Sequence, residues 1–394
     1  MNVLKIKELA TNRIKKGFPL LEELDFVNKD YLVEGDFVKL VDKHNNFIAY
    51  GYIGNERKTA GYVLSLDESD EIDQSFFSKR IKAARDRRTA FYADNKTTAF
   101  RFFNGDGDGV GGLTIDHYEG FYVFSWYSAG IYMHKDMIIK AFKSAVPDFK
   151  GIYEKCRYPN APHKSRFVEG ERAAEPLVIS ENGISYNTYL NEGWMTGIFL
   201  DQRNVRNKIM EEWGMGKTVL NAFSYTGAFS VAAAMGGAVK TVNVDVANRS
   251  KERTIEQFEV NGLDSDQHEI RVMDVFSYLD YAKKHQLQFD LIVLDPPTFA
   301  RTKKRTFSVD KDYTELVKDA VQVLAPGGLI ITSTNAWNVT RDEFFDSVNL
   351  AFEEMNIDAY LVDEFGLPED FAVDKQHPES DYLKVFVLER AKNQ

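Results

Sequence analysis

Cysteine and long apolar runs are scarce in this sequence, and both shortages limit the classes of protein it can be. Cys156 is the only cysteine among 394 residues, so the chain forms no internal disulfide and no cysteine-based metal cluster. No run of about 18 apolar residues occurs, as a membrane-spanning helix would need. The first 16 residues lack the apolar core of a signal peptide. These absences predict a cytoplasmic protein without a membrane partner.

Metal-binding patterns are also missing. The seven histidines show no H-x-x-x-H spacing. Residues 104–109 resemble the start of a calcium loop, but the twelfth position is Ile115, where a bidentate glutamate is required. We therefore expect no metal site, and we interpret residues 104–109 as a glycine-rich turn between strands.

The net charge of −11 argues against a nucleic-acid partner, but the charge is unevenly distributed. From Asp346 to the end, the chain has 12 acidic and 4 basic residues. Basic residues gather in two runs, at 79–88 and 301–305. Such a run is often a solvated helix face, whereas two runs can also form a surface that contacts RNA phosphates. Both alternatives stay open at this point.

The chain divides into three regions with different patterns. Residues 1–70 are strand-rich, and the alternation at 36–42 and 47–53 around a short Asn-containing turn predicts a β-hairpin. Residues 71–185 combine predicted helices with predicted strands, an α+β pattern. The predicted helices cover 75–92 and 134–146, and the strands cover 113–118 and 121–126.

Residues 186–394 alternate between buried strands and helices at intervals of about 25 residues. The predicted strands cover 218–222, 241–246, 269–273, 289–294 and 328–333. The predicted helices cover 227–235, 247–261, 276–285 and 313–324. This alternation predicts a parallel sheet with helices on both faces, which is a doubly wound, Rossmann-like α/β domain.

Ligands of doubly wound sheets bind beyond the carboxyl ends of the strands. The end of the first strand leads into residues 221–227, N-A-F-S-Y-T-G, which lack the glycines that hold a pyrophosphate and so argue against NAD. The next three strands are followed by Asp245, Asp274 and Asp295. Aspartate is also common as a cap or turn residue. Three carboxylates in this order would repel phosphates and suit a ligand with an adenosine, an ammonium and a sulfonium, which is S-adenosylmethionine.

These segments resemble the motifs of bacterial S-adenosylmethionine-dependent methyltransferases of 23S (large-subunit) ribosomal RNA. The G-I-F-L-D-Q-R segment at 197–203 and D-P-P at 295–297 are similar to the same family. The similarity covers most of the chain, including F-F-S-K-R at 76–80 and G-D-G-D-G at 105–109. It implies a PUA-like RNA-binding β domain at 1–70, a central α+β substrate-binding domain at 71–185, and a Rossmann-like methyltransferase domain at 186–394.

The resemblance also implies a cofactor site and an RNA partner. In that site, Gln202 and Arg203 would close over the methionine end of S-adenosylmethionine. The cofactor-binding residues that it implies are Gln202, Arg203, Asn221, Phe223, Ser224, Tyr225, Thr226, Gly227, Asp245, Val246, Asp274, Val275 and Asp295. The RNA would be ribosomal. The sequence leaves the oligomeric state open, with a homodimer as one alternative.

The chemistry follows from where this chain departs from part of that family. Members that methylate cytosine C5 carry a nucleophilic cysteine after the fifth strand, whereas residues 331–337 here contain none. Cys156 lies in the middle domain, and we interpret it as a structural or exposed thiol. Members that methylate guanine N7 carry D-P-P-T-F, which residues 295–299 match, and a Ser-Asn step, which residues 333–335 match loosely. A purine nitrogen needs only positioning, so we predict non-covalent transfer, with guanine N7 favoured.

The predicted catalytic residues are Asp295, Pro296, Pro297, Phe299 and Asn335. Proline carbonyls and the Phe299 ring could hold an extruded base, and the alternative is that Phe299 is a core residue. Three other functions stay open: cytosine-C5 methylation of RNA, methylation of a small molecule or protein, and RNA binding without catalysis. The roughly 185 residues before the methyltransferase domain favour a macromolecular substrate, and the intact aspartates argue against a non-catalytic protein.

Overall fold

The structure is a computed structural model, and it describes residues 1–29, 32–54, 59–301 and 306–392. The chain forms two compact units. The first unit comprises Met1–Ile179, Thr188–Thr196 and Glu369–Ser380, and the second comprises Ser180–Asn187, Gly197–Pro368 and Asp381–Gln394. A short segment from the C-terminal part of the sequence therefore belongs to the first unit. Within the described residues, no helix combines the length and apolarity needed to cross a bilayer.

The N-terminal part of the first unit is a five-stranded sheet with the order β1-β3-β4-β5-β2. Its elements are β1 (Asn2–Lys5), α1 (Glu8–Lys15), β2 (Leu20–Leu21), β3 (Phe37–Val41), β4 (Phe47–Ile53) and β5 (Gly61–Ser65). The antiparallel pairing of β3 with β4 confirms the predicted hairpin. Helix α1 buries Ala10 and Ile14 in the core of this sheet.

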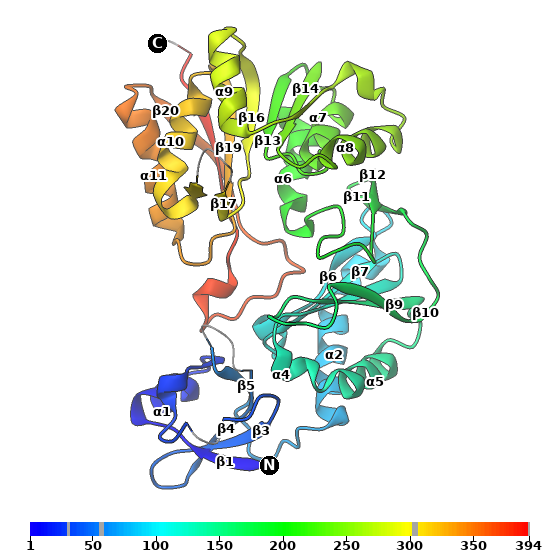
Figure 1. The fold of residues 1–394 in the computed structure, drawn as a ribbon, viewed down its shortest axis with the longest axis vertical. Coiled ribbons are helices and arrows are strands. Elements are labelled where there is room, and N and C mark those ends of the chain that lie inside the picture. Colours follow the sequence, from blue (N-terminus) through cyan, green and yellow to red (C-terminus); the bar gives the residue numbers. More distant parts are fainter. Residues whose placement is uncertain (30–31, 55–58, 302–305, 393–394) are drawn as a thin grey trace. The chain divides into compact units, whose positions relative to one another are not determined.

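The rest of the first unit is built on a second five-stranded sheet, with the order β10-β9-β8-β7-β6 (Figure 1). Its strands are β6 (Ala99–Asn104), β7 (Leu113–Tyr118), β8 (Phe121–Trp126), β9 (Gly151–Cys156) and β10 (Ser165–Gly170), and its helices are α2 (Gln74–Arg87), α3 (Thr89–Ala93), α4 (Ala129–Tyr132) and α5 (Lys135–Ala145). The predicted strands β7 and β8 are confirmed. The prediction of one helix over 75–92 was wrong, because the backbone of Arg88 leaves the helical conformation and separates α2 from α3.

The second unit contains a seven-stranded sheet with the order β15-β14-β13-β16-β19-β21-β20 (Figure 1). Its strands are β13 (Thr218–Ala222), β14 (Lys240–Asp245), β15 (Glu269–Val272), β16 (Phe289–Leu294), β19 (Leu324–Thr334), β20 (Ala359–Phe365) and β21 (Lys384–Arg390). The first five pair in parallel and β21 pairs antiparallel to β19. The doubly wound sheet is thus confirmed, and the chain order reverses between β13 and β16.

Helices cover the sheet of the second unit in two groups. Their bounds are α6 (Arg203–Lys208), α7 (Ala228–Met235), α8 (Ser250–Glu259), α9 (Val275–Lys284), α10 (Val309–Val321) and α11 (Arg341–Glu354). Helix α7 contacts α6 and α8, and helix α10 contacts α9 and α11. Buried side chains of α9, α10 and α11 pack on the sheet in one apolar core. Smaller elements are the β11 (Leu177–Glu181) and β12 (Ile184–Thr188) hairpin, the β17 (Phe299–Arg301) and β18 (Thr306–Ser308) pair, and the short helical turns Leu200–Gln202 and Ile209–Trp213.

Two features of the second unit differ from the predictions. Leu324 was predicted to end a helix, but it begins β19 and lies opposite Phe289 of β16. An apolar residue in a short buried run fits both the helical and the strand pattern, and only its pairing with another strand shows which structure it adopts. Strands β20 and β21 were not predicted. The largely exposed edge strand β20 lacks the apolar alternation that reveals a strand in sequence.

Candidate cofactor site and active site

The parallel strands of the second unit bring the predicted site segments to one edge of the sheet. Residues 221–227 comprise the end of β13 and the turn after it, Asp295 follows β16, and these two strands are neighbours at the reversal point. Asp245 ends β14, and Asp274 comes shortly after β15. Residues 333–335 lie at the end of β19, on the other side of β16. This edge is where doubly wound domains bind their ligands.

The turn after β13 has an unusual backbone. Phe223, Tyr225 and Gly227 have φ angles of +59°, +54° and +81°. A Cβ atom at Gly227 would lie 2.7 Å from the methyl carbon of Thr254, so only glycine fits there. Left-handed backbone at the two aromatic residues costs roughly 1–2 kcal/mol each, and strain of this kind concentrates at functional sites.

Hydrogen bonds join this turn to the segment at 197–203. The N–H of Gly197 donates to the Tyr225 hydroxyl at 3.2 Å. The Thr226 hydroxyl donates to the carbonyl of Gly197 at 2.7 Å. The rings of Phe199 and Tyr225 lie 5.3 Å apart. The structure therefore places together two motifs that are separated in the sequence.

Two of the three strand-end aspartates also have local structural roles. Asp245 accepts the Tyr225 N–H at 2.9 Å on one oxygen and the Ala247 N–H at 2.8 Å on the other. Asp274 caps α9 by accepting the Ser277 N–H at 3.0 Å. Asp274 is therefore a helix cap and Asp245 a turn residue, as the structural alternative in the sequence analysis predicted. Each Asp245 oxygen keeps a second lone pair, and Oδ2 of Asp274 accepts no hydrogen bond from any described residue, so a ligand can still bind both.

The neighbouring valines differ in what they can offer a ligand. Val246 is 62% exposed and can contact a bound molecule through its side chain. Val275 is buried in the apolar core of the second unit, so only its backbone is available to a ligand.

Ser224, in the turn after β13, is also buried, and its N–H donates to the carbonyl of Val244 at 3.0 Å.

Asp295 is the centre of a polar cluster formed by three sequence segments. The Gln202 side-chain amide donates to the Asp295 carboxylate at 3.3 Å and to the Ser333 hydroxyl at 2.7 Å. Burial raises the pKa of Asp295 to about 6, although hydrogen bonds from Ser333 and Gln202 favour the charged form. Asp295 therefore changes its charge close to neutral pH, as groups at active sites often do.

Tyr313 of α10 fixes the ends of the two strands that carry this cluster. The carbonyls of Leu294 at 3.2 Å and Ser333 at 3.1 Å share its single hydroxyl proton, and the hydroxyl oxygen accepts the Ser333 N–H at 3.0 Å. Burial raises its pKa well above the usual value, so it stays protonated. The sequence analysis did not predict this role, because Tyr313 was assigned only as the first residue of a helix over 313–324.

The remaining predicted catalytic residues surround the loop after β16. Asn335 is exposed, and its side-chain carbonyl accepts the Thr298 hydroxyl at 2.7 Å. Pro296 is buried and Pro297 is exposed. Phe299 is 61% exposed, which excludes the core alternative. Its contact with a substrate base stays a prediction.

Several buried polar atoms at this edge of the sheet have no hydrogen-bond partner among the described residues. They are Oδ1 and Nδ2 of Asn221 and Oε1 of Gln202, on side chains that are 1% and 3% exposed. Leaving such an atom unpaired costs about 1–3 kcal/mol. Together with the lone pairs of Asp245 and Asp274, these atoms can accept and donate the hydrogen bonds that the polar, positively charged S-adenosylmethionine requires.

A buried ion pair supports the segment that carries Gln202 and Arg203. Arg206 of α6 donates to both oxygens of Glu181, at 2.6 and 2.8 Å, and to the carbonyl of Phe199 at 2.7 Å. Both side chains of the pair are almost completely buried. Arg203 itself is 5% exposed. Sequence gave no signal for the ion pair, because its two residues lie in different segments.

Cys156 belongs to the first unit and is 1% exposed. Burial raises the pKa of its thiol, which makes it a poor nucleophile. Its sulfur, Glu154 and His163 offer ligand atoms within 4.8 Å of one another. Glu154, however, already accepts hydrogen bonds from His163 at 2.9 Å and Arg166 at 2.8 Å. We interpret this group as a hydrogen-bonded cluster, and the absence of a metal stays a prediction.

The arginines of the basic run at 79–88 mainly pair with carboxylates of the protein itself. Arg88 is completely buried and pairs with Asp108, and Arg87 pairs with the same carboxylate at 2.6 Å. Arg85 pairs with Asp148 at 3.1 Å. Lys79, Lys82 and Arg87 are exposed, although the Arg87 guanidinium is held by its ion pair with Asp108. Most of this run is therefore unavailable to RNA. Of the second run, Arg301 is exposed, and residues 302–305 lie outside the described part of the chain.

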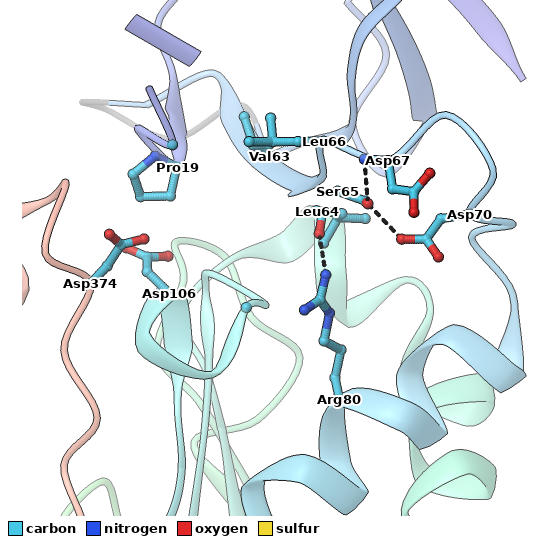
Figure 2. Close-up of a pocket in the computed structure, with 12 residues that line it drawn as sticks. Pro19, Val63, Leu64, Ser65, Leu66, Asp67, Asp70, Arg80, Asp106 and Asp374 are labelled. Atoms are coloured by element: carbon cyan, nitrogen blue, oxygen red, sulfur yellow. Dashed lines mark hydrogen bonds between the residues drawn. The ribbon is translucent and has the colours of Figure 1, made fainter. Parts of the chain in front are cut away.

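The first unit also has a cavity of about 470 Å³ beside β5 and α2 (Figure 2). In Figure 2, Arg80 donates to the carbonyl of Leu64, and Ser65 donates to Asp70. The lining residues are Gly17, Pro19, Val63, Leu64, Ser65, Leu66, Asp67, Asp70, Arg80, Asp106, Gly109 and Asp374. Four carboxylates and one guanidinium make it unsuited to a phosphate. None of the predicted cofactor residues lines it.

Comparisons with known proteins agree with this geometry. Residues 150–374 match the S-adenosylmethionine-dependent methyltransferase family, and residues 4–66 match the PUA-like domain family. The "Putative ribosomal RNA large subunit methyltransferase YwbD" of Bacillus subtilis is 50% identical over 99% of this chain and 100% of its own. The "Ribosomal RNA large subunit methyltransferase I" of Aeromonas salmonicida is 31% identical over 90% of this chain and 91% of its own.

A solved structure is similar over nearly the whole chain. "SMU.776, a putative methyltransferase complexed with SAH" is 42% identical, with a TM-score of 0.93 over 99% of this chain and 100% of that one. The doubly wound sheet and the polar strand ends define an α/β enzyme that transfers methyl groups. The chain belongs to the S-adenosylmethionine-dependent methyltransferase family, and its cofactor is S-adenosylmethionine.

Proposed function

We propose that this protein methylates a base of 23S ribosomal RNA without a covalent enzyme–RNA intermediate. The single observation that carries the mechanism is the cluster around Asp295, where Gln202 and Ser333 meet the carboxylate and no thiol is present. The printed names of its 50% and 31% identical relatives support the substrate. The match of the N-terminal residues to a PUA-like domain supports RNA recognition.

We propose that residues 221–227, Asp245, Asp274 and Gln202 hold the cofactor. When bound there, S-adenosylmethionine would supply an electrophilic methyl group on its sulfonium. The Asp245 carboxylate would accept hydrogen bonds from ribose hydroxyls, and the free oxygen of Asp274 would accept one from the adenine amino group. Oε1 of Gln202, buried and unpaired, would accept one from the ammonium of the methionine end.

The same cluster favours a purine nitrogen, and guanine N7 in particular, as the methyl acceptor. Methylation of N7 leaves a positive charge on the base, and a negative Asp295 would stabilise that charge. N7 has its own lone pair, so the enzyme needs only to hold the base in line. The exposed Phe299 ring and the Pro296 carbonyl would do this. Cytosine C5 would require a thiolate, and the chain's one thiol is buried in the other unit.

We further propose three functional domains: a PUA-like domain at 1–70, a central substrate-binding domain at 71–185, and the methyltransferase domain at 186–394. The protein would act in the cytoplasm, where ribosomes are assembled. Among the alternatives, methylation of a small molecule would leave the extra N-terminal residues without a role.

The test is methyl transfer to an unmodified 23S rRNA transcript with tritiated S-adenosylmethionine, followed by nucleoside analysis. We expect 7-methylguanosine. A 5-methylcytidine product would refute the purine assignment. Binding of the cofactor without any transfer to rRNA would refute the proposed substrate.

A further inference from the structure

The first unit carries a surface of two aromatic and two basic side chains, Tyr127, Arg157, Lys164 and Trp194; Arg157 is half-buried and the other three are exposed. We call it the aromatic-basic surface. Tyr127 directly follows β8 and Arg157 directly follows β9, and these strands pair side by side. Trp194 is 46% exposed and Tyr127 is 42% exposed. The Arg157 guanidinium lies 5.4 Å from the centre of the Tyr127 ring, and the Lys164 ammonium lies 5.0 Å from that of the Trp194 ring.

The Trp194 ring is held in place although it faces solvent. Its indole N–H donates to the carbonyl of Cys156 at 3.0 Å, and its own carbonyl accepts a hydrogen bond from Arg157. The buried Lys155 ammonium holds the preceding residue by donating to the carbonyl of Gly193 at 2.9 Å. A fixed, exposed aromatic ring binds a planar ligand at a low cost in conformational entropy.

The charge of this surface is not neutralised within the protein. Neither Arg157 nor Lys164 forms an ion pair with a carboxylate of the described residues, whereas the arginines Arg85, Arg87 and Arg88 all do. In a chain of net charge −11, two such cations beside two exposed rings favour a partner that is anionic and planar. Single-stranded RNA has both properties, because its phosphates are charged and every base has a face that stacks.

We propose that the aromatic-basic surface binds a single-stranded segment of the RNA substrate, with bases stacking on Trp194 and Tyr127 and phosphates contacting Arg157 and Lys164. The inference rests on the proposed function for the identity of the RNA. In the sequence, Trp194 comes three residues before Gly197, which binds the turn of the cofactor site. An acidic protein would satisfy the two cations, but it would give the exposed rings no stacking partner of their own.

The experiment compares Trp194→Ala with Lys164→Gln and with the double variant. Trp194→Phe keeps an aromatic ring, so comparing it with Trp194→Ala separates the loss of stacking from a local loss of structure. The matched control is Tyr281→Ala with Lys284→Gln, which removes an aromatic and a basic residue three apart on α9; Tyr281 is 41% exposed and Lys284 is exposed.

Four quantities are measured for each variant: KM and kcat on the 23S transcript, cofactor affinity, and the affinity for a labelled oligouridine. The oligouridine has about 12 nucleotides, a length within the range of site sizes of single-strand binders. We expect the double variant to lose at least about fivefold in oligouridine affinity, the lower end for one stacked base. The KM for rRNA should rise while cofactor affinity stays unchanged. Lys164→Gln should lower the salt dependence of binding by about one released counterion.

The outcomes separate this inference from the proposed function. If the wild type methylates rRNA but the double variant matches the control in RNA affinity and KM, the aromatic-basic surface does not bind RNA, and a protein partner becomes the better explanation. If the wild type binds the oligouridine through this surface but does not methylate 23S rRNA, the surface is supported and the proposed substrate is refuted.

Discussion

Replacing Arg88 tests how the structure uses the basic run at 79–88. The side chain is fully buried, and its guanidinium donates to both oxygens of Asp108, at 2.8 and 2.7 Å. It also donates to the carbonyls of Arg101 at 2.9 Å and Asp370 at 2.6 Å. The second carbonyl belongs to Glu369–Ser380, the C-terminal segment that is part of the first unit. We expect Arg88→Ala to destabilise the first unit.

The magnitude follows from what the substitution leaves behind. Removing one partner of a buried ion pair typically costs about 3–5 kcal/mol. Asp108 would keep its ion pair with Arg87 at 2.6 Å and the N–H of Asn104 at 2.7 Å, so the cost lies near the lower end, about 3 kcal/mol. The carbonyl of Asp370 would also lose a charged donor, which loosens the C-terminal segment.

The assay is urea unfolding followed by tryptophan fluorescence, since Trp126 is buried in the same unit. Lys82→Ala is the matched control, because Lys82 is exposed on α2, the helix that ends just before Arg88, and should change the free energy of unfolding by less than about 0.5 kcal/mol. Arg88→Met combined with Asp108→Asn should cost less than the sum of the single changes. If Arg88→Ala were as stable as the wild type within about 0.5 kcal/mol, the buried pair would not have the role that we assign to it.

The other predictions concern the methyltransferase site. Asp245→Ala removes two backbone hydrogen bonds and the predicted ribose contacts, so calorimetry should show at least a roughly tenfold weaker affinity for S-adenosylmethionine; unchanged affinity in a folded variant would show that Asp245 does not bind the cofactor. Methyl transfer should increase as the pH rises through about 6, where Asp295 loses its proton, and Asp295→Asn should be less active and lack this dependence; the same dependence in both proteins would assign it to another group. Because its folded pKa is raised, Asp295 binds more protons folded than unfolded between pH 3.8 and about 6, so its contribution to stability falls as the pH rises through that range. Cys156→Ala should keep nearly full activity on the 23S transcript, and a wild-type protein–RNA adduct that this variant cannot form would contradict the non-covalent mechanism.

The local sequence was sufficient for much of the second unit. The alternation of strands and helices predicted β13 and β16 with correct bounds, and it placed Asp245, Asp274 and Asp295 at the ends of successive strands. Such predictions succeed because strand and helix periods are local properties, and because parallel strands in this chain order must bring their carboxyl ends to one edge. The absence of cysteine from residues 331–337 can likewise be seen in the sequence without a structure.

The sequence by itself therefore determined the class of fold, the strand-end motifs and the lack of a catalytic thiol near them. Tertiary structure alone decided how individual side chains are used: Arg88 is buried instead of facing solvent, and the Tyr313 hydroxyl joins the ends of β16 and β19. It also decided that residues Glu369–Ser380 belong to the first unit, where Arg88 contacts a residue 282 positions away. No local pattern encodes such contacts, because burial and hydrogen bonding depend on which distant segments the completed fold brings together.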